Sequence, residues 1–235
     1  MPKRVAIVQS NYIPWKGYFD LMRLADEFVL YDDVQYTRRD WRNRNKIKTA
    51  NGVQWLTVPV EVKGKYTQTI RETRVSEPGW AADHWTRLKH AYAKAPHFRD
   101  YADALGAVYA GLASPWLSEV NETLIRWVAA ELGVPSKITQ SNIYDLTAAD
   151  PTQRLADICK QAGATAYLSG PAAKAYLDES VFAAAGVSVE YMDYAGYPEY
   201  PQVHPPFEHA VTALDLLFHA GRAAGRFMER TPRAA

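Results

Sequence analysis

The sequence predicts an α/β protein: a Rossmann-like parallel sheet flanked by helices, with a β-hairpin and a helical insertion. Short runs of β-branched and apolar residues alternate with amphipathic stretches at both ends of the chain. A continuous helical pattern lies between them, at about residues 80–133. Strands that alternate with helices form parallel sheets whose crossovers are right-handed. We therefore expect a single α/β domain over residues 1–235.

The first third of the chain combines strand-like and helix-like runs. Val5–Val8 is too short for a buried helix, whereas the apolar residues of 16–25 recur at the spacing of one helix face. Residues 53–60 and 67–75 flank Gly64 and are expected to pair as a hairpin at the sheet edge. The expected elements are, in order, a strand at 5–8, a helix at 16–25, a strand at 28–31, an extended polar loop at 33–52, and strands at 53–60 and 67–75.

The rest of the chain is divided by prolines and glycines. Pro96 separates two helical patterns, Pro115 begins a third, and Asp150-Pro151 caps another. Residues 194–206 contain four prolines and three tyrosines and are expected to be irregular, and the tail RTPRAA to be loose. The expected elements are helices at 81–94, 98–112 and 116–132, a strand at 136–140, a helix at 152–162, a strand at 166–169, helices at 172–178 and 179–185, a strand at 187–192 and a helix at 207–221.

Composition excludes several classes of protein. The single cysteine, Cys159, excludes an internal disulfide framework and a Cys-rich metal site, and its helical context predicts burial. The six histidines form no metal signature, so no metal site is predicted. No apolar run approaches the ~20 residues that span a bilayer, and the N-terminus lacks a signal-peptide core, so we expect a cytoplasmic protein.

The loop after the first strand is more polar than a strand-to-helix connection requires. A polar turn that leads into a helix N-terminus can bind an anion, and Lys16 would add a full charge. The alternative is a simple connection with a packed Trp15. Neither a dinucleotide-binding nor a P-loop glycine pattern is present. The binding candidates in this loop are Gln9, Asn11, Tyr12, Trp15, Lys16 and Tyr18.

Three aspartates are the catalytic candidates: Asp32, Asp33 and Asp40. Asp32 and Asp33 follow the second strand, and neighbouring residues of an extended chain point to opposite faces. One carboxylate can orient a substrate, hold Mg²⁺ or act as a general base, while the other pairs with an arginine. The alternative is a strand-ending turn in which the aspartates bond to their own backbone.

Residues 38–48, RRDWRNRNKIK, combine arginine with aromatic and amide side chains. Arginine binds phosphate or carboxylate through two parallel hydrogen bonds, and an aromatic residue can stack on a ring. The alternative is a solvated basic loop, which the interleaved Trp, Asn and Asp argue against. The formal net charge of +1 argues neither for nor against a polyanionic partner, but nucleic acid is a poor candidate because no other segment is basic enough to follow its backbone. The binding candidates here are Gln35, Tyr36, Trp41, Arg42, Asn43, Arg44 and Lys46.

These segments resemble the WbqC-like family, and the similarity covers almost the whole chain. It is carried by QSNYIPWKGYFDLM, YDDVQYTRRDWRNRNKIK and WLTVPV, and later by TAYLSGPAAKAYLD and YPQVHPPFEHAVTALDLLFHAG. Members of this family are associated with bacterial O-antigen and surface-polysaccharide gene clusters. The resemblance therefore implies a role in making or modifying an activated sugar.

The resulting hypothesis is a transferase that modifies a small-molecule substrate, a nucleotide-linked amino sugar, by acyl or aminoacyl transfer. Residues expected to close the other side of its site are Ser169, Gly170, Tyr200 and Gln202. The alternatives are a non-catalytic module that binds a sugar nucleotide or a partner enzyme, and a diverged nucleotidyltransferase. The last lacks the paired histidines of its mechanism, since Tyr18 stands at the second position. The sequence indicates no particular cofactor and no oligomeric state.

Overall fold

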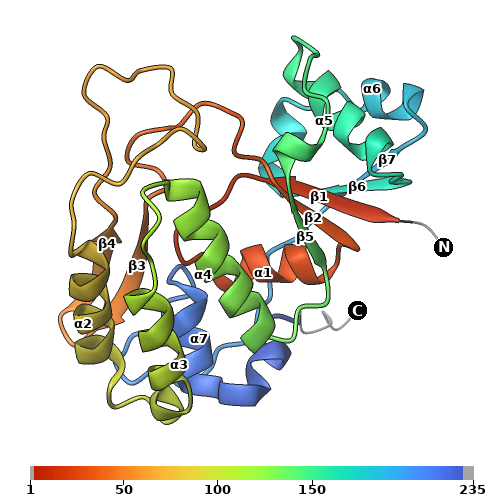
Figure 1. Ribbon diagram of the computed structural model, residues 1–235. Helices are drawn as coiled ribbons and strands as arrows, with labels where there is room; N and C mark the ends of the chain where they lie inside the picture. The colour runs from red at the N-terminus through yellow and green to blue at the C-terminus, as the bar shows by residue number, and fades with distance from the viewer. Residues whose placement is uncertain (1–2, 230–235) are drawn as a thin grey trace, which may run out of the picture.

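The computed structural model describes residues 3–229, which form a parallel sheet beside a helical lobe (Figure 1). The sheet of this described part has five strands in the order β5-β2-β1-β6-β7, and each neighbouring pair is parallel. The strands are β1 Arg4–Val8, β2 Glu27–Leu30, β5 Lys137–Gln140, β6 Ala166–Ser169 and β7 Ser188–Tyr191. The predicted α/β class with a parallel sheet is therefore confirmed.

Helices cover both faces of the sheet because its strands are apolar on both sides. Alternate residues of β1 enter different cores: Ala6 packs with the cluster around Phe19, and Val5 and Ile7 with the cluster around Ile158. The helices concerned are α1 Lys16–Arg23 on the first face, and α5 Pro151–Gln161 and α6 Glu179–Ala184 on the second. The predicted Asp150 cap of α5 is confirmed, since its carboxylate accepts a hydrogen bond from the Gln153 N–H at 2.8 Å.

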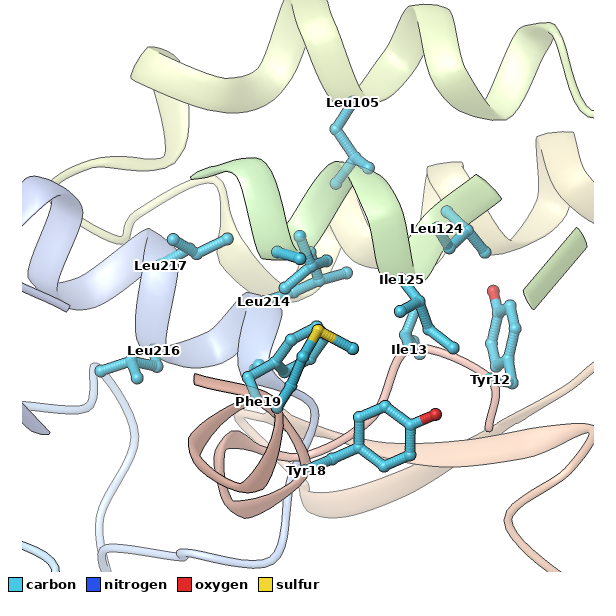
Figure 2. Close-up of a cluster of buried hydrophobic side chains, with 14 of the residues drawn as sticks. Tyr12, Ile13, Tyr18, Phe19, Leu105, Leu124, Ile125, Leu214, Leu216 and Leu217 are labelled. Carbon is cyan, nitrogen blue, oxygen red and sulfur yellow. The ribbon is translucent and has the colours of Figure 1, made fainter. Parts of the chain in front are cut away.

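The helical lobe lies on the α1 side of the sheet (Figure 1). Its helices are α2 Trp80–Tyr92, α3 Phe98–Ala110, α4 Leu117–Glu131 and α7 Ala213–Ala220. In Figure 2, Ile13 and Phe19 face the leucines of this lobe, among them Leu105 and Leu214. The loop after β1 is thus anchored in the largest core of the protein, and its polar residues are held in fixed places.

A β-hairpin is present as expected, but the expectation of a loop at 33–52 was wrong in its second half, and so was the expected pairing of residues 53–60 with 67–75. The strand β3 Arg44–Thr49 pairs antiparallel with β4 Gly52–Thr57, as a hairpin separate from the main sheet. Residues 53–60 and 67–75 meet instead at an isolated bridge between Val60 and Val75. The pattern was missed because a buried polar residue, Asn45 at 2% exposure, occupies an inward position next to Ile47.

Smaller differences concern helix ends. Residues 171–175 form a 3-10 helix in place of the expected helix at 172–178. The last α-helix begins at Ala213 instead of residue 207, and a 3-10 helix at 221–227 follows it. The expected loose tail at 230–235 lies outside the described residues. Within residues 3–229, no helix is long and apolar enough to cross a membrane.

Candidate functional site

A cavity of about 290 Å³ opens where the loop after β1 meets the segment before β3. Its lining residues are Asn11, Pro14, Trp15, Trp41, Asn45 and Ala210. The Tyr12 N–H donates to the Trp41 carbonyl at 3.0 Å, which joins the two segments. The Asn45 amide also donates to the carbonyls of Tyr12 and Ile13, at 3.1 and 2.8 Å. The structure therefore brings three predicted binding residues, Asn11, Trp15 and Trp41, to one cavity.

Two tryptophans and two cations extend from this cavity along the outer side of the hairpin. The rings of Trp41 and Trp55 lie 5.2 Å apart and are 39% and 37% exposed. Arg44 lies 4.2 Å from the Trp55 ring centre, and Lys46 lies 5.3 Å from Trp55 and 5.8 Å from Trp41. We call these four residues the tryptophan face. Its cations are stabilised by the rings, and their N–H groups can still bind an anion.

Sequence reasoning missed Trp55. It lies in the predicted strand at 53–60, where an aromatic residue is usual. The pairing register places Trp55 opposite Lys46 on β3. Its alternation with Leu56, which is fully buried, was the available signal that Trp55 points outward.

Arg42 and Asp40 contact two residues that line this cavity, Asn11 and Trp41. The Arg42 side chain is only 13% exposed and donates to the Asn11 side-chain oxygen, and it lies 3.5 Å from the Asp40 carboxylate. Burial lowers the pKa of Arg42 against the opposing effect of Asp40. Asp40 also accepts a hydrogen bond from the Trp41 N–H at 2.7 Å. Arg42 therefore orients Asn11, and it is less available to a ligand than Arg44 or Lys46.

The acid pair after β2 is engaged in contacts within the protein. Asp32 is fully buried and accepts hydrogen bonds from the Ser10 N–H, at 2.8 Å, and from the Ser118 hydroxyl. Burial raises the pKa of Asp32 in spite of these bonds. Asp33 receives two parallel hydrogen bonds from Arg71, at 2.7 and 3.0 Å. Burial opposes ionisation of Asp33, but the bonds from Arg71 and Ser141 outweigh it and lower the pKa.

Several predicted binding residues belong to the core. The Tyr12 hydroxyl is bonded to His84 Nδ1 at 2.7 Å and to the Tyr109 hydroxyl at 2.8 Å. Figure 2 shows Tyr12 and Tyr18 among the buried side chains. The Tyr18 hydroxyl donates to the Gln9 carbonyl at 3.3 Å. Two further predicted residues, Tyr36 and Asn43, are also buried.

Lys16 lies in a buried cluster with the C-terminal segment. Its ammonium donates to the Pro198 carbonyl at 3.2 Å and lies 5.1 to 5.8 Å from the ring centres of Tyr197, Tyr200 and Phe207. Burial lowers the pKa of Lys16 to about 8. Two other predicted residues, Tyr200 and Gln202, each donate to the Asp215 carboxylate at 2.8 Å. This cluster ties α1 to the segment before α7 and does not line the Trp41 cavity.

The remaining predicted residues lie elsewhere. Gln9, Ser169 and Gly170 line a second cavity, at the carboxyl ends of β1 and β6. The Gln35 amide donates to the Tyr66 carbonyl at 2.8 Å. Among the residues that the structure describes, no three His, Cys, Asp or Glu side chains are grouped so that they could hold a metal ion.

Comparisons with known proteins connect this chain to one protein family. The model of the WbqC-like protein family matches residues 9–227. A protein of Mycobacterium tuberculosis (strain ATCC 25618 / H37Rv), named "Uncharacterized protein Rv1507c", is 49% identical over 226 residues, which are 96% of this chain and 97% of that protein. No solved structure matches the chain.

Proposed function

The chain belongs to the WbqC-like protein family, and from this premise we propose that it is a cytoplasmic transferase of surface-polysaccharide biosynthesis. Its substrate is a nucleotide-linked amino sugar, which it modifies by acyl or aminoacyl transfer. The observation that carries the proposal is the Trp41 cavity and the tryptophan face beside it. A family-level association with polysaccharides supports a sugar ligand, and the cations of this face support a phosphate-bearing one.

The cavity suits a single sugar ring. About 290 Å³ is at the lower end of the ~300–1,000 Å³ of small-molecule sites. The rings of Trp15 and Trp41 offer apolar surface for the C–H face of a sugar. The Asn11 amide nitrogen can donate to a hydroxyl, because Arg42 holds the amide oxygen. The phosphates then lie outside, where Arg44 and Lys46 bind them as charge-assisted donors.

Asp40 is the carboxylate that the proposal assigns as general base. Asp32 and Asp33 are occupied by Ser118 and Arg71, whereas the Asp40 side chain is 29% exposed beside Trp41. In the transfer, the sugar amine attacks the acyl carbon of an activated acyl donor and a C–N bond forms. Asp40 accepts the amine proton, and the bond to the donor's leaving group breaks with the electron pair on that group.

A non-catalytic binding module would use the same tryptophan face. A binding measurement therefore cannot distinguish it from the transferase, whereas a measurement of turnover can. The nucleotidyltransferase alternative is weaker. Tyr18, which stands where that mechanism needs a histidine, is 4% exposed and bonded to a backbone carbonyl. A buried phenol of this kind does not replace an exposed cation at a transferring phosphate.

Binding is tested by calorimetry with UDP- and dTDP-linked sugars on wild type, Arg44→Ala and Arg99→Ala. We expect Arg44→Ala to weaken binding about 10- to 100-fold, since a charge-assisted hydrogen bond is lost, with nearly unchanged melting temperature. Arg99 is an exposed arginine of α3, and its variant is the matched control. Unfolding of Arg44→Ala would make this residue structural, and no binding of any sugar nucleotide would refute the proposal.

Catalysis is tested by mass spectrometry of a bound sugar nucleotide incubated with acyl and aminoacyl donors. We expect a mass increase with wild type and its loss in Asp40→Asn, while binding persists. If the sugar nucleotide binds but its mass is unchanged with every donor, the transferase proposal is refuted and the non-catalytic binding module is favoured.

A further inference from the structure

A second cavity, of about 390 Å³, lies where the order of the strands in the sheet reverses, between β1 and β6. β1 neighbours β2 on one side and β6 on the other, and α1 and α5 cover opposite faces of the sheet. Chain crossovers therefore diverge between β1 and β6, and a crevice opens beyond their carboxyl ends. Open α/β sheets bind ligands in this crevice. Gln9 and Ser169, at the ends of β1 and β6, line the cavity.

Two polar side chains of this cavity have buried atoms without a partner among the described residues: the Tyr31 hydroxyl and Arg154 Nε. Tyr31 is only 9% exposed, so the hydroxyl is shielded from solvent. A buried polar group without a partner destabilises the protein, and a ligand that supplies the missing hydrogen bond removes this cost. Burial raises the pKa of Tyr31, although Arg154 opposes the shift, so the hydroxyl is a neutral donor at neutral pH.

The lining describes the ligand's chemistry. Arg154 is the one charged side chain among the described lining residues, and Tyr31 and Ser169 add hydroxyls. Most of the other lining is apolar, and the Tyr176 ring at the rim is 72% exposed. A single cation with two hydroxyls matches one phosphate group, and an exposed aromatic ring can stack on a flat base.

We propose that this cavity is a second ligand site, which binds a nucleoside monophosphate with its phosphate on Arg154, Tyr31 and Ser169 and its base against Tyr176. The site does not depend on the proposed sugar site. The two are neighbours, because Gln9 and Asn11, on the same loop, line one cavity each and their Cα atoms lie at most about 7.6 Å apart. In a two-substrate transferase, this site would hold a nucleotide-bearing donor.

The test is calorimetric titration of the full chain with AMP, UMP, inorganic phosphate and benzoate. The variants are Arg154→Gln, Tyr31→Phe and the control Arg99→Gln. We expect a nucleoside monophosphate to bind more tightly than phosphate or benzoate, with at least about tenfold loss in Arg154→Gln. Tyr31→Phe should weaken binding several-fold at unchanged melting temperature, because its hydroxyl has no partner within residues 3–229. Arg99→Gln should bind as wild type does.

The failures of the two proposals are distinguishable. Absence of nucleotide binding at millimolar concentration, equal loss in Arg154→Gln and Arg99→Gln, or benzoate or phosphate binding as tightly as the nucleotide would overturn this site. Nucleotide binding lost in Arg44→Ala but kept in Arg154→Gln would place the nucleotide on the tryptophan face and also overturn it. If neither wild type nor any variant binds a sugar nucleotide but AMP still binds, only the proposed sugar site is refuted.

Discussion

Glu27 offers a stability prediction whose size can be worked out from its contacts. It lies on the interior strand β2, between β5 and β1, with its side chain 2% exposed. Its carboxylate accepts hydrogen bonds from Lys3 at 2.8 Å, from Thr139 at 2.9 Å and from Tyr144. These bonds connect β2 to the chain before β1 and to β5. The perturbation is Glu27→Gln, which keeps the shape and removes the charge.

The magnitude follows from the pKa of Glu27. Burial opposes ionisation, but the bonds from Lys3, Tyr144 and Thr139 lower the pKa from 4.5 to about 2. The difference of about 2.5 corresponds to about 3 kcal/mol at neutral pH. The Lys3 side chain is 36% exposed, so solvent screening reduces our estimate to about 2 kcal/mol.

The direction of the pH dependence follows from the same pKa. Because the folded pKa lies below the unfolded one, the stabilisation is present above pH 4.5 and is lost as the pH falls toward 2. Urea unfolding at pH 7 and at about pH 3 measures it. We expect Glu27→Gln to be less stable by about 2 kcal/mol at pH 7, and the deficit to fall below half of that value at about pH 3.

A matched control is Glu190→Gln. Glu190 is also a strand glutamate and pairs with Arg4 at 3.1 Å, but both side chains are more than 40% exposed. We expect this variant to change stability by less than about 0.5 kcal/mol. Equal stability of Glu27→Gln and wild type at pH 7, or a deficit that is the same at both pH values, would refute the reasoning.

Two further predictions concern buried groups. Tyr12→Phe should lower the free energy of unfolding by about 1–2 kcal/mol, because His84 and Tyr109 each lose a buried partner, and should leave sugar-nucleotide affinity unchanged. Urea unfolding and calorimetry check it, and lost affinity at full stability would show that Tyr12 contacts the ligand. Cys159 is fully buried, and burial raises its pKa to about 12, so iodoacetamide should label the protein at pH 8 only when urea is present. Rapid labelling of the native protein, followed by mass spectrometry, would contradict this.

Local patterns were sufficient for most elements of the main sheet. The strand at 5–8 and the helix capped by Asp150 were predicted because β-branched runs and caps act within a few residues. The strand β3 was missed because its inward Asn45 is satisfied by the carbonyls of Tyr12 and Ile13, more than 30 residues away. A polar residue on the buried face hides the alternation that identifies a strand.

The sequence indicated which segments contribute to the candidate site but not which of their residues line the cavity. Polarity drew attention to the loop after β1 and to residues 38–48, where Asn11 and Trp41 do line a cavity. Polarity did not separate them from Tyr12, whose hydroxyl is bonded inside the core. A phenol or an amide has the same sequence signature whether it binds a ligand or another part of the chain.

The sequence by itself therefore determined the α/β class, the order of most elements and the family, because periodicity, caps and motifs are local properties. Only the tertiary structure decided which polar groups face a cavity. Lys16 is held by the Pro198 carbonyl and Arg42 by Asn11, contacts between residues 182 and 31 positions apart. The free energy of a polar side chain depends on its burial and its partner, and both arise only when distant segments pack together.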